Sequence, residues 1–251
     1  MSGSILIAQI TDCHLSADPQ MKYRGINAHQ NLKSLLNNVK LLKPDLLLAS
    51  GDLSEDGSRA SYEALKGYLD PLDIPVLALP GNHDDFKLLS GVFPGSPIDR
   101  VTVSEHGPWQ ILRLNSSLPG RPEGRLAERT LTELENILAS QPQRPHLIAL
   151  HHQPISVGSP WIDKYRLFDA EAFLQIVDQY TNVKAVVWGH VHQAFETDRN
   201  GTAMLGGPSS AINGRPGAQK FSEDPGGPAC RWLKLSCEAT LLTGVTRSGR
   251  D

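Results

Sequence analysis

The residues best suited to chemistry in this sequence are carboxylates, histidines and one asparagine that directly follow short apolar runs. They occur in five places, namely Asp12-Cys13-His14, Gly51-Asp52, Gly81-Asn82-His83-Asp84, His151-His152 and Gly189-His190-Val191-His192. These places hold six of the nine histidines of the chain. Their oxygen and nitrogen donors suit Mn, Fe, Zn or Ni ions, and no cluster of cysteines offers thiolate ligands instead. The residue types therefore predict a metal site.

The number of such residues favours two metal ions held close together. A pair of metals about 3.5–4 Å apart can clamp a displacement at phosphorus. Such a pair needs a bridging carboxylate and several further ligands for each ion. We expect Asp12 with His14, and His190 with His192, to lie in extended segments, where alternate residues point to the same side. Cys13, between two of these residues, should then point away from them into the core.

Each motif alone has an ordinary structural explanation. An Asp-x-His or Gly-Asp after a strand is commonly a turn, Gly-Asn-His-Asp fits a turn as well as it fits a site, and tandem histidines can be one buried and one exposed side chain. Turns alone do not easily explain all five motifs in chain order, each after a predicted strand. We therefore interpret them as parts of one site.

Apolar runs and helical spacing predict the elements that would position these residues. Strands are predicted at residues 5–8, 46–49, 75–79, 109–114, 146–150 and 183–188. Helices are predicted at about 32–42, 58–69, 126–138 and 170–177. Strands that alternate with helices indicate an α/β fold whose strands are mainly covered on both faces. The polar motifs lie beyond the carboxyl ends of the strands, where open α/β sheets bind ligands.

The last quarter of the chain has a different pattern. Helical spacing is lost after Phe195, and glycines and prolines interrupt short apolar segments. We expect antiparallel strands at about 232–235 and 239–245, and a loop at about 206–228, all packed on the main body. Residues 1–251 are thus predicted to form a single domain.

Composition excludes several classes of protein. The 251 residues carry 24 Lys and Arg against 27 Asp and Glu, a formal net charge of -3, which argues against a general nucleic-acid-binding surface. The longest apolar runs are far shorter than the roughly 20 residues that span a membrane. The first residues lack a secretory pattern, and three cysteines without a C-x-x-C pair do not suggest a disulfide scaffold. These features predict a cytoplasmic location.

Together, Asp12-x-His14, Gly51-Asp52, Gly81-Asn82-His83-Asp84, His151 and Gly189-His190-x-His192 resemble the signature of the calcineurin-like metallophosphoesterases. The resemblance extends from Ile5 to about Val245 and implies a four-layer α/β/β/α sandwich of two mixed sheets flanked by helices. The chain looks closest to the class III cyclic-nucleotide phosphodiesterases of the bacterial 3',5'-cyclic AMP phosphodiesterase type. Three stretches carry that closer likeness, residues 9–15, residues 79–84, and His151-His152-Gln153-Pro154 followed by Trp161-Ile162-Asp163.

The resemblance implies a role for each matching residue. Asp12, His14 and His192 would bind the first metal, Asn82, His151 and His190 would bind the second, and Asp52 would bridge both. His83 would contact the phosphate and protonate the leaving oxygen. Asp84 would orient or polarise His83. His152 is expected to be structural rather than a ligand.

The implied reaction is hydrolysis of a phosphodiester by a hydroxide held between the two metals. The segment after Asp52 lacks the arginine that protein Ser/Thr phosphatases carry there, and Asp84 stands where they have glutamate. Since a phosphomonoester dianion benefits more from arginine forks than a diester does, diesters are favoured. The main hypothesis is conversion of 3',5'-cyclic AMP to 5'-AMP. The alternatives are a broader phosphodiesterase, acting on glycerophosphodiesters, 2',3'-cyclic nucleotides or aryl diesters, and a catalytically silent metal-binding scaffold.

The resemblance also bears on cofactors and partners. Two divalent or mixed-valence ions are expected, with Mn or Fe favoured over Zn, Ni or Co. The partner would be a small phosphodiester, with neither nucleic acid nor membrane involved, and a homodimer is left open. Tyr23 and Trp161 are the aromatic candidates for stacking a base, although each could instead pack on its own loop.

Overall fold

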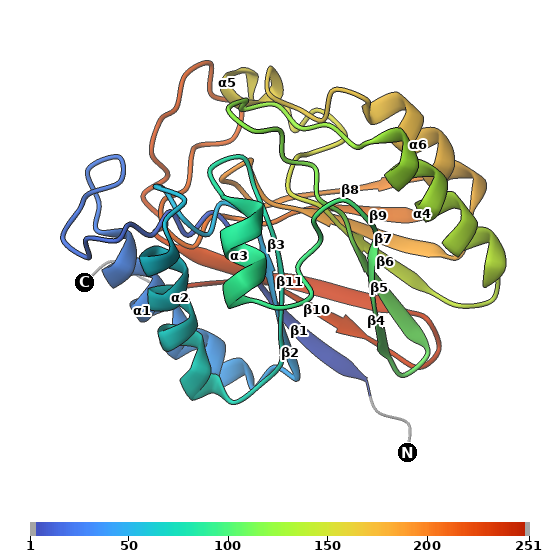
Figure 1. Cartoon of the computed structure of the whole chain (residues 1–251), viewed down its shortest axis with the longest axis horizontal. Coiled ribbons are helices and arrows are strands. Elements are labelled where there is room, and N and C mark those ends of the chain that lie inside the picture. The colour runs from blue at the N-terminus through green and yellow to red at the C-terminus, as the bar shows by residue number, and fades with distance from the viewer. Residues whose placement is uncertain (1–3, 249–251) are drawn as a thin grey trace.

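The computed structural model describes residues 4–248 of the chain. Two β-sheets lie face to face, and helices cover the outer face of each sheet (Figure 1). This arrangement is the four-layer α/β/β/α sandwich of two mixed sheets that the family resemblance implies, and that expectation is confirmed.

The first sheet has five strands in the order β11-β10-β1-β2-β3. They are β1 (Ile5–Ile10), β2 (Leu46–Ser50), β3 (Val76–Leu79), β10 (Ala229–Leu235) and β11 (Leu241–Arg247). The first three strands of the chain run parallel, and β10 and β11 add antiparallel pairs at one side. The parallel strands therefore bring their carboxyl ends, and the residues that follow them, to one edge of the sheet.

The second sheet has six strands in the order β4-β5-β6-β7-β9-β8. They are β4 (Thr102–His106), β5 (Trp109–Arg113), β6 (His146–Ala149), β7 (Val183–Trp188), β8 (Phe195–Arg199) and β9 (Thr202–Gly206). The four central strands run parallel, while β4 and β8 are antiparallel at the two sides. The strands β6 and β7 precede the histidine motifs, so those motifs also share one edge.

The helices form the two outer layers. The first sheet is covered by α1 (Ala28–Leu42), α2 (Arg59–Leu69) and α3 (Phe86–Val92), and η1 (Asp70–Leu72) extends α2. The second sheet is covered by α4 (Glu128–Ser140) and α6 (Ala170–Gln179), while α5 (Pro160–Asp163) lies in the loop after β6 (Figure 1). Side-chain N-caps fix three of the starts, at Asn27, Ser58 and Asp85.

Three apolar cores correspond to the three interfaces between layers. In β2, Leu47 and Ala49 pack toward the helices, whereas Leu46 and Leu48 pack toward the other sheet. All five residues of β2 are buried. A strand covered on both faces reads as a continuous apolar run rather than an alternating one, and this is why such runs in the sequence locate the central strands.

Polar side chains also link the two sheets. Gln9 of β1 donates to the carbonyl of Trp188 in β7 at 3.0 Å and to Ser50 Oγ in β2 at 2.9 Å. Arg113 of β5 donates to the carbonyl of Ala78 in β3 at 2.9 Å. These buried bonds hold the sheets at a fixed separation just beneath the edge where the motifs lie.

The elements that the sequence analysis missed are short or exposed. The strand β4 has an alternating half-exposed pattern over polar residues, and β8 has the sequence FETDR. The helix α3 spans 7 residues, too few for a clear helical period. Among the helices described for residues 4–248, none combines the length and apolar character that a membrane span needs.

The core between the sheets should be a main source of stability. Leu147 in β6 is 0% exposed and packs in this core. Replacing Leu147 with Ala should lower the free energy of unfolding by about 2–5 kcal/mol, because the cavity cannot close between two rigid sheets. Urea unfolding measures the change. Leu41→Ala, at a side chain that is 80% exposed on α1, is the control and should change stability by less than about 0.5 kcal/mol. An equal effect of both substitutions would contradict this account of the core.

Candidate metal centre

The five motifs meet in space, although they are far apart in the chain. Backbone hydrogen bonds join the turns within each sheet, from Asp12 N to the carbonyl of Gly51 at 2.9 Å and from Gly189 N to that of His151 at 3.1 Å. Across the sheets, His190 N donates to Asp12 Oδ2 at 3.0 Å. The structure thus brings the seven predicted ligands, and His83, to one end of the sandwich.

Five of the predicted ligands have left-handed backbone conformations. Their φ angles are 52° at Asp12, 45° at His14, 49° at Asp52, 65° at His190 and 49° at His192. Asp and His tolerate this region better than most residues, but each instance costs on the order of 1–3 kcal/mol. Asp-x-His and His-x-His are therefore not extended segments, and that prediction is wrong. The chain instead turns sharply at each ligand, which aims the side chain across the strand ends.

The first ligand group comprises Asp12, His14 and His192, which are all buried. His192 Nε2 lies 3.3 Å from Asp12 Oδ1 and 3.2 Å from His14 Nε2. The remaining ring nitrogens are engaged, since His14 Nδ1 contacts Glu55 Oε2 at 2.8 Å and His192 Nδ1 contacts the carbonyl of Ile212 at 2.8 Å. Such partners fix the ring so that Nε2 faces a metal.

The second ligand group comprises Asn82, His151 and His190, which lie beside Asp52. Among residues 4–248, Asn82 Oδ1, His151 Nε2 and His190 Nε2 are buried atoms without a hydrogen-bond partner. A buried polar atom left unpaired costs about 1–3 kcal/mol, so several in one place need an explanation. A cation coordinated by these atoms supplies one, and the donor set therefore fits a bound metal ion.

Asp52 lies between the two groups. Its Oδ2 atom is 3.3 Å from His151 Nε2 and 3.9 Å from His14 Nε2. Burial raises the pKa of Asp52, but His151 and the other histidines outweigh burial and hold that pKa well below its ordinary value. The same contact raises the pKa of His151 to about 9 against the effect of burial. The carboxylate thus favours positive charge on both sides, as a bridging ligand requires.

A glycine is required beside each of two ligands. Gly51 has a φ of +93°, and a Cβ at this position would overlap the His151 ring. A Cβ on Gly189 would overlap Thr11 Oγ1 and lie 2.9 Å from Asp12 Oδ2. Cys13, by contrast, is 0% exposed and packs in the core under the helices of the first sheet, as predicted.

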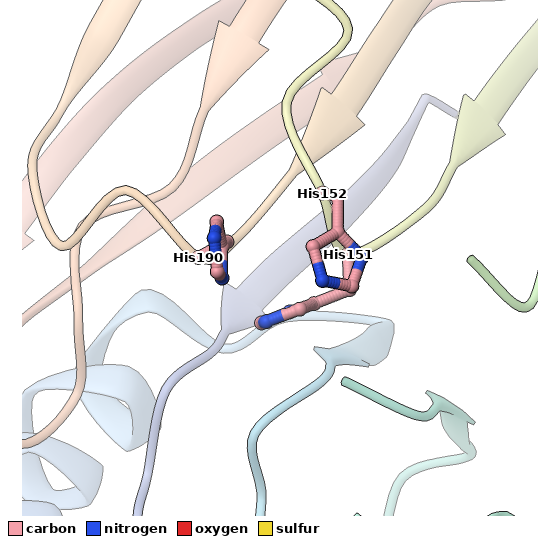
Figure 2. Close-up of side chains that lie close together, drawn as sticks. All are labelled: His151, His152 and His190. Carbon is pink, nitrogen blue, oxygen red and sulfur yellow. The ribbon is translucent and has the colours of Figure 1, made fainter. Parts of the chain in front are cut away.

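His152 lies beside two of the ligands. Figure 2 shows the rings of His151, His152 and His190 turned toward one another, and the ring centroids of His152 and His190 are 4.6 Å apart. Ser116 Oγ lies 2.9 Å from His152 Nδ1, and burial lowers the pKa of His152 to about 3. His152 is therefore a neutral ring that supports the ligand rings from behind.

His83 is the most exposed of the motif histidines. Its side chain is 36% exposed, and Nδ1 lies 3.2 Å from Glu55 Oε2. Burial lowers the pKa of His83, but the bond to Glu55 and the charge of Asp52 outweigh burial and raise the pKa to about 9. His83 is thus held as a proton donor at the edge of the ligand groups.

The sequence analysis assigned the wrong partner to His83. Asp84 accepts hydrogen bonds from the backbone of Leu53, Ser54 and Gly81 at 2.8–3.2 Å, and from Tyr62 at 3.1 Å. Asp84 therefore ties the turn after β2 to the turn after β3, and Glu55 contacts His83 instead. The sequence analysis missed Glu55 because it lies outside the five motifs. Its position three residues after Asp52 is the one feature of the sequence that could have suggested a role.

Two cavities flank Asn82 and His83. One, of about 380 Å³, extends over the ligands His14, His190 and His192 and is lined by Tyr23, Trp161 and Phe221 together with basic residues. The other, of about 470 Å³, lies on the side of Phe86, Lys87 and residues 117–120. A substrate at the ligand groups can therefore extend in either direction past His83.

Comparison with known proteins agrees with this geometry. Residues 5–194 match the calcineurin-like phosphoesterase family. The chain is 37% identical over 250 residues to the 3',5'-cyclic adenosine monophosphate phosphodiesterase CpdA of Vibrio vulnificus, covering 98% of this chain and 90% of that protein. It is 37% identical over 245 residues to a 3',5'-cyclic-nucleotide phosphodiesterase of Nostoc sp., covering 97% and 92%.

Solved structures with a similar fold include a dimetal phosphatase from Danio rerio. The TM-score is 0.70 at 16% identity, covering 95% of this chain and 98% of the zebrafish chain. The purple acid phosphatase PPD1 of yellow lupin gives a TM-score of 0.69 at 15% identity, covering 99% of this chain and 52% of the lupin chain. At such low identity these likenesses show the fold alone.

Asp52 provides a direct test of the ligand groups. Asp52→Asn should lower the bound metal by more than one ion per chain, because the amide removes the negative charge that both groups share. Metal content after dialysis measures the change. Asp73→Asn, at an exposed turn after η1 with a φ of 53° that Asn tolerates, is the matched control and should retain all metal. Two ions per chain in Asp52→Asn would contradict the bridging role.

Proposed function

The chain belongs to the calcineurin-like phosphoesterase family, and from that premise we propose that it hydrolyses 3',5'-cyclic AMP to 5'-AMP with two bound metal ions. The resemblance predicted from the motifs is confirmed by the family match and by relatives that align over nearly the whole chain. The observation that carries the proposal is the convergence of two buried atoms without a hydrogen-bond partner, Asn82 Oδ1 and His190 Nε2, with His151 Nε2 and Asp52.

We assign the proposed ligands to two ions as the family resemblance implies. Asp12, His14 and His192 would hold the first, Asn82, His151 and His190 the second, and Asp52 would contact both. Two such cations would supply Lewis acidity at phosphorus and lower the pKa of water near it. Oxygen and nitrogen donors without thiolate suit Mn, Fe, Zn or Ni, and we propose Mn or Fe as the native metals because the family resemblance favours them.

His83 is placed to complete the reaction. Hydrolysis of the cyclic diester adds water to phosphorus and breaks the bond from phosphorus to O3', which must then gain a proton. His83 Nδ1 is held by Glu55, so Nε2 is the atom that can face the leaving oxygen. As a protonated ring, His83 also offsets negative charge on the phosphoryl group before it gives up its proton.

A broader phosphodiesterase activity is the second candidate. The cavity of about 470 Å³ beyond His83 could receive a second ester arm, which a compact cyclic nucleotide lacks. This observation favours linear diesters such as glycerophosphodiesters or aryl diesters. A silent scaffold is disfavoured, because the seven ligand residues and His83 are all present and converge.

A substrate panel tests the proposal. With added manganese, kcat/KM for 3',5'-cyclic AMP should exceed that for 2',3'-cyclic AMP, glycerophosphoethanolamine and bis-(p-nitrophenyl) phosphate by about tenfold or more, or about 1.4 kcal/mol. Equal values across the panel would support the broader enzyme. If protein that holds two metals per chain turns over none of these diesters, both enzyme proposals are wrong and the catalytically silent scaffold is supported.

His83→Ala should separate proton transfer from metal binding. We expect kcat for cyclic AMP to fall about 10²- to 10⁴-fold, because the leaving oxygen loses its proton donor. Metal content should stay at the wild-type value, since His83 is not a proposed ligand. His106→Ala, on β4 at the far side of the second sheet, is the control. A loss of metal in proportion to activity would show that His83 is a ligand instead.

A further inference from the structure

Three aromatic rings from distant parts of the chain surround the histidines of the first ligand group. The Tyr23 ring stacks on His14 with centroids 3.9 Å apart and planes 11° apart. Trp161 and Phe221 present edges to His192 at 6.2 and 6.5 Å. All three are half-buried and line the cavity of about 380 Å³. Tyr23 stacks face to face on His14, whereas Trp161 and Phe221 make only perpendicular contacts with the ligand histidines and are the better candidates to stack on a bound base.

The Phe221 ring is fixed by its neighbours. It meets Trp161 edge to face, with centroids 5.2 Å apart and planes at 83°. The Arg24 guanidinium lies 4.3 Å from the centroid of the Phe221 ring, and Arg24 Nε donates to the Tyr23 hydroxyl at 3.0 Å. A guanidinium over a ring face is attracted to it. Arg24 thus joins the loop of Tyr23 to the loop of Phe221 across the mouth of the cavity.

The loop that carries Phe221 is anchored directly to the metal ligands. Gly214 N donates to the carbonyl of His192 at 2.8 Å, and Asp224 N donates to that of Asn213 at 2.8 Å. Between these points Gly217 N donates to Ser159 Oγ at 2.9 Å, beside the start of α5. These hydrogen bonds hold the loop close to His192, and they therefore fix the distance between the Phe221 ring and the ligand groups.

The same cavity offers positive charge beside its aromatic rings. Arg24, Lys164 and Lys220 line it, although the chain as a whole has a formal net charge of -3. An aromatic surface and basic residues beside the proposed metal ligands match a ligand with a planar base and an anionic phosphate.

We propose that the purine ring of the nucleotide stacks on Phe221, whose orientation Trp161 fixes by its edge-to-face contact. Arg24 is a positioning residue that holds Phe221 at the cavity. This assignment rests on the proposed function, and it makes Phe221 the determinant of base selection. Stacking of a base on an aromatic side chain changes affinity by about 5- to 100-fold when the ring is removed.

The experiment compares ligands that differ only in the base. Calorimetry on the metal-loaded protein gives the Kd of 5'-AMP and of ribose 5-phosphate, and kinetics give KM and kcat for cyclic AMP. Phe221→Ala should weaken 5'-AMP about 5- to 100-fold and leave ribose 5-phosphate unchanged. KM for cyclic AMP should rise with little change in kcat. Phe221→Tyr should restore most of the affinity, and Phe168→Ala, whose ring is 77% exposed, should behave as wild type.

The outcomes separate this inference from the proposed function. If wild-type protein binds 5'-AMP no more tightly than ribose 5-phosphate, or if Phe221→Ala leaves their ratio unchanged, the base does not stack on Phe221. If wild-type protein prefers 5'-AMP but does not hydrolyse cyclic AMP, the stacking surface stands and the proposed substrate is wrong. An equal loss of both ligands in Phe221→Ala would indicate collapse of the loop and overturn the assignment.

Discussion

The structure depends on holding several carboxylates and imidazoles together in a buried place, where their interactions with one another do not satisfy all of their polar atoms. Asp12, Asp52 and His151 offer ligand atoms within 4.8 Å of one another, and all three side chains are buried. Charges and unpaired donors cost free energy in such a place unless cations compensate them. The protein must therefore fix these atoms before any ion arrives, and the left-handed turns at the strand ends are the means.

Rigidity of that kind comes from the two sheets together. The link from Gln9 to the carbonyl of Trp188 ties β1 to β7, and His151 Nδ1 contacts the carbonyl of Ser50 at 2.9 Å at the ends of β6 and β2. The ligand residues that follow the strands of one sheet are thus held in place by contacts with the other sheet. The spacing of the two layers, set by the apolar core between them, therefore fixes how far apart the ligands of each proposed metal lie, because each metal would take ligands from both sheets.

The sequence predicts the central strands well, and it marks the residues that converge at one edge of the sheets, because both depend on local signals. An apolar run such as residues 46–49 can be recognised as a buried strand without knowing the tertiary fold. The polar motifs then mark the turns that follow such strands. The backbone conformation of Asp12 was not predictable, because it results from contacts with a turn some forty residues away. Glu55 and Phe221 were missed for the same reason, since only folding brings them to His83 and Trp161. Asp84 was assigned to the wrong partner because adjacency in a motif does not give side-chain direction.

Cys13 stands between two proposed ligands, yet its sulfur packs among the apolar residues beneath α1 and α2. A thiol so close to a binuclear centre could otherwise capture a thiophilic ion such as cadmium or mercury, or be alkylated and oxidised at the cost of the neighbouring ligands. The Cys13 side chain points into the core, so its sulfur is kept away from the proposed metals although Cys13 is adjacent in the chain to two of their ligands. The centre should accordingly tolerate thiol reagents that reach its mouth, provided that the strand ends stay folded.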